Sequence, residues 1–305
     1  MHIAILSRKR TLHSTSNLMR AALERDHDVS VIDPMRCNLS MGKGEPRIYH
    51  EGETLTDIDV VIPRIGASIT TYGLAVVSHF DMMGVPVVNS PAGIFRSRDK
   101  LRSMQILSRM DIDMPRTYIC RRPEDIDAAI RYCGGFPIIL KLHQGTQGVG
   151  VMIADSRDSA ESILDIFFSM GHIILIQQFI KESRGKDIRA LVLGDQVCAA
   201  MKREARMGEF RSNIHRGGTG RVVRLSDEEE RVAIQAAAVL GINIAGVDML
   251  MGKDGPKVIE VNSSPGFEGL EAATGRDIAG DIIDFTIDYA ERARRGEIAE
   301  PPRIG

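Results

Sequence analysis

The sequence AGVDMLMGKDGPKVIEVNSSPG occupies residues 245–266 and contains the pattern that decides the fold. Two apolar runs flank the turn residues GKDG, which predicts an antiparallel hairpin. With the turn centred at position 254, Met251 faces Lys257 across the hairpin and Asp248 faces Glu260. The second strand ends in polar and glycine residues, and strand ends of this kind often carry functional sites.

Asp248, Glu260 and Asn262 share one face of this hairpin, because side chains alternate along a strand. Two carboxylates and one amide oxygen are the hard ligands that Mg²⁺ or Mn²⁺ prefers. Solvated hairpin faces show the same pattern without a metal. Spacing alone therefore leaves a metal site and an ordinary polar face as two open interpretations.

The first part of the chain alternates between apolar strands and amphipathic helices. Strands are expected at 2–7, 28–33, 59–63 and 85–89, and helices at 14–25 and 72–83. A β-α-β alternation predicts a parallel sheet with helices on its faces. The segment 37–55 has few periodic apolar positions, which indicates a loop or a small hairpin.

The pattern changes after about residue 90. Helices are expected at 99–110, 159–170 and 281–295, and strands at 138–142, 151–154, 173–178, 188–193, 197–203, 247–251 and 257–262. Ser226 and Glu229 form a capping box that opens a further helix, and Gly241 closes it. The chain is thus expected to combine an α/β region with α+β regions.

Lys141 precedes a glycine-rich segment, GTQGVG at residues 145–150, that joins two expected strands. Three glycines in six residues let backbone N–H groups turn toward an anion. The G-K-[ST] signature and a following helix are both missing, so a Walker A loop is excluded. The segment is either a phosphate-covering loop, which Lys141 would assist as a point charge, or a plain hairpin loop.

Seven basic residues lie between positions 202 and 224, where only Glu204 and Glu209 oppose them: Lys202, Arg203, Arg206, Arg211, Arg216, Arg221 and Arg224. This segment could hold phosphates, an acidic peptide or RNA, or it could be a solvated basic face. Glycine and serine separate the basic residues, and aromatic residues do not. Base stacking is therefore not supported. No direct nucleic-acid partner is expected for the protein.

The composition bounds the remaining possibilities. A chain of 305 residues is long enough for two or three domains of roughly 100–200 residues. The hydrophobic fraction of 43% and net charge of −2 exclude wholesale disorder, a rod and a basic nucleic-acid coat. Four cysteines without C-x-x-C spacing indicate reduced thiols in a cytoplasmic protein. No apolar window is suited to a membrane span.

Taken together, these motifs resemble the ATP-grasp superfamily, and within it the RimK branch of L-glutamate ligases, over nearly the whole chain. The matching stretches are PRIG at 63–66, RDKLRS at 98–103, GTQG at 145–148, FRSNIHRGG at 210–218, AGVD at 245–248 and EVNSSPG at 260–266. The resemblance implies an N-terminal parallel-sheet pre-ATP-grasp domain at 1–95. It also implies two lobes, 96–185 and 186–305, that grip ATP between them.

The resemblance also implies residue roles. ATP phosphates would be bound by Lys100 and Lys141, adenine by the hinge residues Gln178 and Phe179, the ribose by Asp187, the phosphates and acyl-phosphate by Arg211, Ser212 and Asn213, and two Mg²⁺ or Mn²⁺ ions by Asp248, Glu260 and Asn262. Arg211 and Lys141 would be catalytic. Relatives usually carry glutamate at the position of Gln178 and often an acid at the position of Gln144.

The implied activity is ATP-dependent addition of L-glutamate, through an acyl-phosphate, to a protein or peptide C-terminus. A small-subunit ribosomal protein is the leading acceptor, and a basic segment suits an acidic tail. A small-molecule or free glutamyl-peptide acceptor, or a non-catalytic nucleotide-binding regulator, are the alternatives. The glycine-rich segment is expected to close over the intermediate and exclude water. Relatives are homotetramers, so a homo-oligomer is expected.

Overall fold

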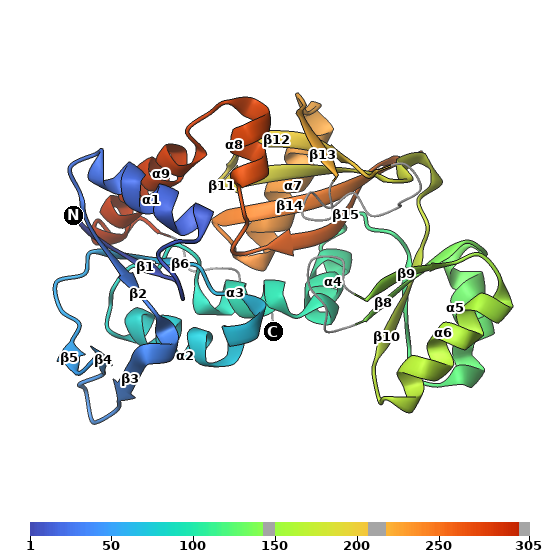
Figure 1. Ribbon diagram of the computed structural model, residues 1–305, viewed down its shortest axis with the longest axis horizontal. Helices are drawn as coiled ribbons and strands as arrows, with labels where there is room; N and C mark the ends of the chain where they lie inside the picture. Colours follow the sequence, from blue (N-terminus) through green and yellow to red (C-terminus); the bar gives the residue numbers. More distant parts are fainter. Residues whose placement is uncertain (143–149, 207–217, 299–305) are drawn as a thin grey trace.

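The computed structural model describes residues 1–142, 150–206 and 218–298, and these residues form a mixed α/β structure with four sheets (Figure 1). Three of the sheets follow one another along the long axis of the molecule. The N-terminal parallel sheet lies at one end, a five-stranded sheet in the middle and a four-stranded sheet at the other end. The expected combination of a parallel N-terminal region with antiparallel sheets is confirmed.

The N-terminal sheet is parallel in the order β2-β1-β6. Its elements are β1 (His2–Leu6), α1 (His13–Leu23), β2 (Asp28–Ile32), β6 (Val60–Pro63) and α2 (Thr70–Met82). The fourth strand expected at 85–89 is wrong, because only an isolated bridge joins Val87 to Val61. Pro86 has no N–H to donate to a ladder, which limits pairing at this edge.

The segment expected to be a loop or small hairpin forms a separate three-stranded antiparallel sheet. Its strands are β3 (Cys37–Ser40), β4 (Arg47–His50) and β5 (Glu53–Thr54). Ile48 is fully buried in the core that the N-terminal sheet shares with α2. β3 and β4 each bury one side chain and β5 buries none, which leaves little periodic signal and explains why the sequence pattern is weak here.

The four-stranded sheet is antiparallel in the order β7-β10-β8-β9, and two helices cover one of its faces (Figure 1). Its elements are β7 (Thr117–Cys120), α5 (Ile126–Cys133), β8 (Ile138–Leu142), β9 (Val151–Ala154), α6 (Arg157–Ser169) and β10 (Ile174–Gln178). The short elements β7 and α5 were not predicted. Two helices precede this sheet, α3 (Pro91–Arg98) and α4 (Lys100–Arg109).

The five-stranded sheet is antiparallel in the order β13-β12-β11-β14-β15. Its strands are β11 (Lys186–Leu193), β12 (Gln196–Glu204), β13 (Thr219–Val222), β14 (Ile244–Gly252) and β15 (Gly255–Asn262). Helix α7 (Asp227–Leu240) packs on it through the alanines and leucine of a shared core. The capping box of Ser226 with Glu229 is confirmed, as is the left-handed C-cap at Gly241 (φ 75°).

The predicted hairpin is confirmed with one change of register. Asp248 pairs with Glu260 as expected, but Met251 pairs with Pro256 rather than with Lys257. A bulge lies between the two positions, where Ile259 is the additional residue on β15. Close to the turn, the observed register therefore differs by one residue from the expected one. The bulge restores the expected register at Asp248 and Glu260.

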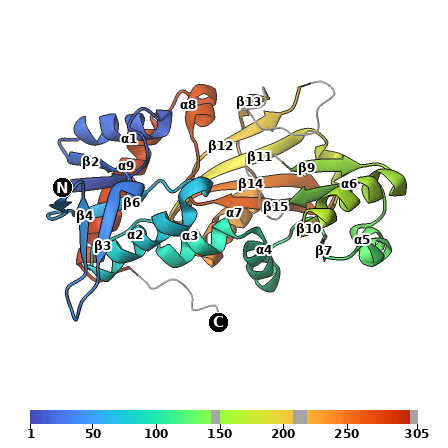
Figure 2. The same cartoon turned by 60° about the horizontal axis from the view of Figure 1, so that its bottom comes forward.

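The last described helix packs against the N-terminal region. After α8 (Glu268–Thr274), helix α9 (Ile278–Arg294) lies beside α1, and both views show the two helices together (Figures 1 and 2). Residues of α1, β1, β6, α9 and the five-stranded sheet share one hydrophobic core. The first and last parts of the chain thus stabilise each other.

Asn89 links the N-terminal region to the hairpin. Its side-chain amide donates to the carbonyls of Ile244 and Ser263, each at 2.9 Å. Its side-chain oxygen accepts from the N–H groups of Asn243 (2.9 Å) and Ile244 (2.8 Å). Asn89 is 2% exposed, so these four bonds satisfy backbone groups that water cannot reach.

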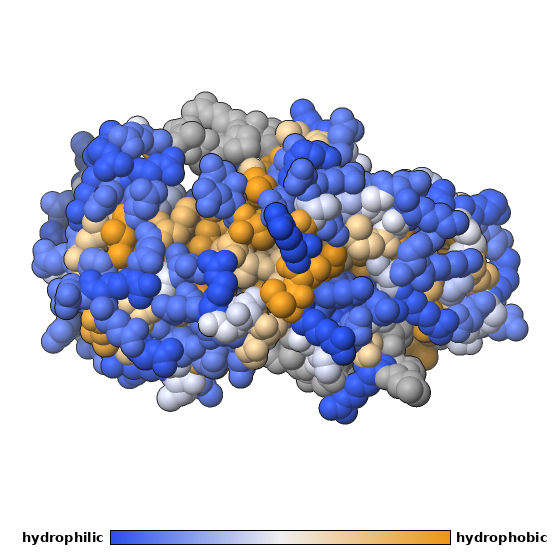
Figure 3. Space-filling view, turned by 90° about the horizontal axis from the view of Figure 1, so that it is seen from above, coloured by the Kyte–Doolittle hydropathy of each residue, from blue (hydrophilic) through white to orange (hydrophobic). Residues whose placement is uncertain are grey.

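The surface shown in Figure 3 is polar at both ends of the molecule, and apolar side chains gather near its middle. Among the described residues, no helix combines the length and apolar character needed to cross a bilayer. All four cysteines are free thiols, and Cys37, Cys120 and Cys133 are buried. The prediction of mostly buried thiols is confirmed.

Candidate active site

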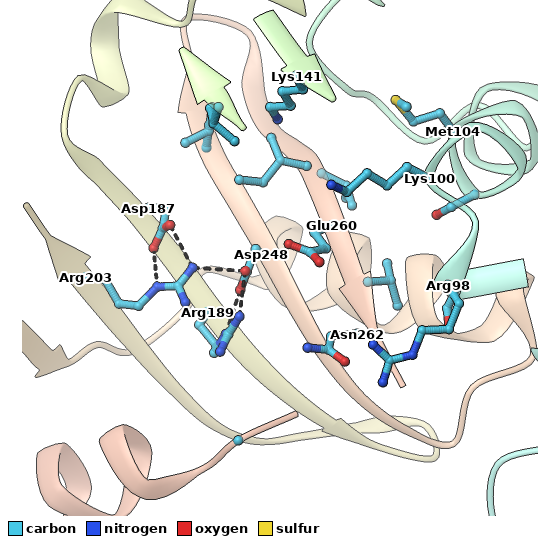
Figure 4. Close-up of a pocket in the computed structure, with 18 of the residues that line it drawn as sticks. Arg98, Lys100, Met104, Lys141, Asp187, Arg189, Arg203, Asp248, Glu260 and Asn262 are labelled. Atoms are coloured by element: carbon cyan, nitrogen blue, oxygen red, sulfur yellow. Dashed lines mark hydrogen bonds and ion pairs between the residues drawn. The ribbon is translucent and has the colours of Figure 1, made fainter. Parts of the chain in front are cut away.

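A cavity of about 580 Å³ lies where the N-terminal region, the four-stranded sheet and the five-stranded sheet approach one another (Figure 4). Eight of the residues predicted to form the site line it: Lys100, Lys141, Gln178, Phe179, Asp187, Asp248, Glu260 and Asn262. The three predicted residues Arg211, Ser212 and Asn213 lie outside the described residues, as do Gln144 and positions 145–149 of the glycine-rich segment. Residues far apart in the sequence thus meet in one place.

Asp248 lies at the centre of a buried network of charges (Figure 4). Arg189, directly opposite on β11, donates two hydrogen bonds of 2.7 Å to its two oxygens. Arg203 lies 3.0 Å from Asp248 and donates to both oxygens of Asp187 at 2.6 and 2.7 Å. Asp187, Arg203 and Asp248 are each at most 7% exposed, so solvent screens these pairs little.

The network sets the charge state of its members. Burial alone would raise the pKa of Asp248, but the charges of Arg189 and Arg203 outweigh this effect and hold it at about 2. Burial would likewise lower the pKa of Arg203, and the two aspartates instead raise it well above its usual value. Both groups are therefore ionised throughout the physiological range.

Two lysines face the network from the other side of the cavity. The pKa of Lys141 is lowered to about 8, chiefly by burial; Glu260 and Asp248 oppose this shift, and neighbouring Lys100 adds to it. Burial also lowers the pKa of Lys100, against the attraction of Glu260. Two cations held in a partly desolvated cavity are stabilised when an anion joins them.

The oxygen ligands predicted for a metal lie on adjacent strands. Asp248 pairs with Glu260, and Asn262 lies two residues beyond Glu260 on β15. Glu260 is solvent-exposed and has no ion pair among the described residues. Asp248 accepts three arginine contacts, which leave about one lone-pair direction open. The donor set therefore fits a hard divalent cation, and Glu260 is its more accessible member.

Charge in the cavity is strongly unbalanced. Among the described residues, eight lysines and arginines line it, whereas Asp187, Asp248 and Glu260 are the acidic side chains there. Such an excess of positive charge suits an anion that carries several charges, such as a triphosphate.

Two family models match the sequence. One, described as the RimK-like ATP-grasp domain, matches residues 97–286, and the other, described as the RimK PreATP-grasp domain, matches residues 1–94. The chain belongs to the RimK-like ATP-grasp family.

Named relatives support this family membership over more than nine-tenths of the chain. A probable alpha-L-glutamate ligase of Aliivibrio fischeri (strain MJ11) is 52% identical over 93% of this chain and 95% of its own. The probable alpha-L-glutamate ligase 1 of Shewanella denitrificans is 52% identical over 96% of this chain and 100% of its own. The expected identity as an ATP-dependent ligase is confirmed.

Solved structures confirm the ATP-grasp fold. A RimK domain protein from Sphaerobacter thermophilus has a TM-score of 0.69 and 25% identity, and covers 94% of this chain and 100% of its own. The ATP-grasp ligase PsnB, complexed with a minimal precursor, has a TM-score of 0.76 and 22% identity, and covers 94% of this chain and 98% of its own.

In this RimK-like chain, β10 ends at Gln178 and Phe179 follows it directly. The Gln178 N–H donates to the Arg116 carbonyl at 2.8 Å, and the Gln178 side-chain oxygen accepts from the Arg116 N–H at 3.3 Å. The apolar side chains Ile139, Leu175 and Leu250 line the same cavity. A flat apolar base would find suitable surface there.

Two arginines of the network were missed or misread. Arg203 was assigned to a basic surface segment, but it is 4% exposed and lies in the buried network. Arg189 was not singled out. The signal for both was present, because Asp187 and Arg189 alternate on one strand opposite Arg203 and Asp248. Without the strand order, opposite charges on separate strands could not be matched.

Proposed function

We propose that this protein uses ATP to join the amino group of L-glutamate to the C-terminal carboxylate of a protein or peptide, through an acyl-phosphate. The name probable alpha-L-glutamate ligase of its 52%-identical relatives supports glutamate as the added amino acid. A structure of PsnB complexed with a precursor peptide and AMPPNP supports a peptide acceptor. We retain a small-subunit ribosomal protein as the leading acceptor.

The nucleotide would lie across the cavity. Gln178 and Phe179 would hold the adenine, Asp187 the ribose, and Lys100 and Lys141 the phosphates. The lowered pKa values of the two lysines support their role, because an added triphosphate offsets the cost of holding them charged in a desolvated place. Lys141 would also be catalytic, since charge builds on the transferred phosphoryl group.

Asp248, Glu260 and Asn262 would hold Mg²⁺, for which a structure of PsnB with Mg and ADP gives support. The cation would supply neutralisation of the phosphate oxygens. Arg189 and Arg203 keep Asp248 ionised and fix its carboxylate in one orientation. A rigid, ionised ligand binds a cation with less reorganisation than a free one.

The reaction would then follow from charge and exclusion of water. An acceptor carboxylate is repelled by a bare triphosphate, and the positive excess of the cavity reduces that repulsion. The carboxylate oxygen attacks the γ-phosphorus and ADP leaves, which forms the acyl-phosphate. The neutral amino group of L-glutamate attacks the acyl carbon, so that a C–N bond forms, phosphate leaves and the amine loses a proton. Water must be excluded meanwhile, because it would hydrolyse the acyl-phosphate.

The observation that carries this proposal is the placement of Lys100, Lys141, Asp248, Glu260 and Asn262 around one cavity. The test incubates the protein with ATP, Mg²⁺ and L-glutamate, with and without ribosomal proteins, and reads products by mass spectrometry. A ladder of glutamyl additions on one ribosomal protein is expected. A ladder of free glutamate oligomers alone would move the acceptor to a small peptide, and the absence of both product and ADP would overturn the proposal.

Variants sharpen the same test. Lys141→Met and Glu260→Gln are expected to leave a folded protein with little or no ligation. The matched control is Lys253→Met, because Lys253 lies in the β14–β15 turn with 82% of its side chain exposed. Near-normal turnover by both site variants would refute the assignment of the site.

A further inference from the structure

The cavity extends beyond Asn262 to a region where β6, α3 and the residues after β15 meet. Arg64 follows β6 and Arg98 ends α3, and both line the cavity there. Small polar residues surround them: Ser7, Ser14, Thr15 and Ser264. In Figure 4 the guanidinium of Arg98 points toward the end of β15, where Asn262 lies. None of the nucleotide or metal roles proposed above uses these arginines.

Neither arginine has an acidic partner among the described residues. Within residues 1–142, 150–206 and 218–298, no carboxylate lies within 4.0 Å of Arg64 or Arg98, although both are largely shielded from solvent. Arg64 donates to Ser14 Oγ (3.0 Å) and to the Pro265 carbonyl (2.8 Å), both neutral acceptors. Arg98 donates to the Ile65 carbonyl, and its buried Nε has no acceptor in the described part of the chain.

The two guanidiniums also repel each other. Burial and, to a smaller extent, the charge of Arg98 together lower the pKa of Arg64 to about 10. Burial lowers the pKa of Arg98 as well, and Glu260 only partly opposes this. Adjacent cations with unused donors and no counter-ion are stabilised by an anion that accepts from both. Arginine forks match the two oxygens of a carboxylate.

We propose that Arg64 and Arg98 bind a substrate carboxylate that the reaction does not activate. This inference rests on the proposed function, in which such carboxylates come from two sources. L-Glutamate keeps two carboxylates when its amino group attacks, and an acceptor that ends in glutamate keeps the one on its side chain. The position supports this assignment, because the arginines lie beyond the metal-ligand end of β15, away from Gln178 and Phe179.

The experiment compares Arg98→Gln and Arg98→Lys with the wild-type protein. It measures the KM for L-glutamate, the KM for an acceptor peptide that ends in glutamate, and the Kd for ATP. Arg98→Gln is expected to raise one of the two KM values by about 30-fold or more, since a buried partner of a charged group is removed. The Kd for ATP is expected to stay within about 2-fold. Arg98→Lys should recover part of the loss, because it keeps the charge.

A matched control is Arg102→Gln, because Arg102 is exposed, stacks over Phe95 and does not line the cavity. The two KM values and the Kd for ATP should be unchanged in this variant. If Arg98→Gln is unstable, Arg64→Lys gives a second test, since it keeps the charge but loses the fork.

The outcomes separate the sources. A rise in the KM for L-glutamate alone assigns the carboxylate to the incoming amino acid, and a rise in the KM for the peptide alone assigns it to the acceptor. An equal loss of ATP affinity would show that the arginines hold phosphate and would overturn the inference. So would changes below about 3-fold in both KM values while the wild-type protein ligates normally, which would leave the proposed function intact. A wild-type protein that neither ligates nor binds L-glutamate or peptide by calorimetry would overturn both.

Discussion

Replacing Arg203 with methionine tests whether the buried network supports the fold as well as the site. Methionine retains an extended side chain but has no guanidinium, so the substitution removes two hydrogen bonds to Asp187 and the contact to Asp248. Breaking one partner out of a buried ion pair costs about 3–5 kcal/mol, because a buried charge loses its compensation. The lowered pKa of Asp248 points in the same direction, because Arg189 and Arg203 stabilise its ionised form.

The free energy of unfolding is measured in urea at pH 7 for wild type, Arg203→Met and an exposed control, Arg295→Met. Arg295 pairs with Glu297 at the surface, so the control should lose less than about 1 kcal/mol. A double variant, Arg203→Met with Asp187→Asn, should recover part of the loss, because it removes a buried charge along with its partner. A cavity alone would not be repaired in this way.

The dependence of the unfolding free energy on acid pH provides a second test of the network. The pKa of Asp248 is lower in the folded state than in the unfolded chain. The stabilisation is therefore complete above about pH 4 and is lost as the pH falls toward about 2. This part of the acid profile should shrink in Arg203→Met. A loss below about 1 kcal/mol at pH 7, or an unchanged acid profile, would refute the reasoning.

Three further changes have defined outcomes. The pKa of Lys141 is lowered to about 8, so its ammonium loses its proton as the pH rises through that value. The affinity for ATP, measured by calorimetry, should therefore fall above about pH 8. Lys141→Arg should flatten this pH dependence, because the guanidinium stays charged. Gly93→Ala would bring a Cβ to 2.2 Å from the Gly241 carbonyl oxygen and should cost about 1–3 kcal/mol or more in urea, whereas Gly42→Ala, which meets nothing within 4 Å, should change little. Ser226→Ala removes the capping box of α7 and should lower the unfolding free energy by about 1 kcal/mol; no loss would mean that the cap is redundant.

The parts of the fold that sequence predicted best are those with strong local signals. The Ser226 capping box and the Gly241 cap placed α7 within a residue, because both ends are determined by nearby backbone groups. The Asp248–Glu260 pairing came out as expected because two offsets cancel: the turn pairs Met251 with Pro256, one residue from the expected register, and a bulge then restores it. Even there, the bulge at Ile259 was invisible, because one extra residue in an apolar run leaves the alternation of Glu260 and Asn262 unchanged.

The parts that could not be predicted depend on strand order. Arg203 looks like a member of a basic segment until β11 places Asp187 opposite it and brings Asp248 alongside. Arg98 and Arg64 are 34 positions apart, and only the packing of α3 against the end of β6 brings them together. The expected strand at 85–89 failed for a different reason. Its apolar run suggested pairing, but Pro86 has no N–H to extend the ladder beyond the isolated bridge between Val87 and Val61.

The bonds of Asn89 have a consequence for chimeric proteins. An exchange of N-terminal segments between relatives would transfer or remove the group that satisfies the backbone of residues 243, 244 and 263. A crossover placed before position 89 retains that group with its partners, whereas one placed after it depends on the incoming segment to carry an asparagine there. The helix α9, which comes from the other end of the chain, would also need a matching α1. Residues 1–94 thus match a family model of their own, but in the folded protein they share a core and buried hydrogen bonds with the C-terminal half of the chain.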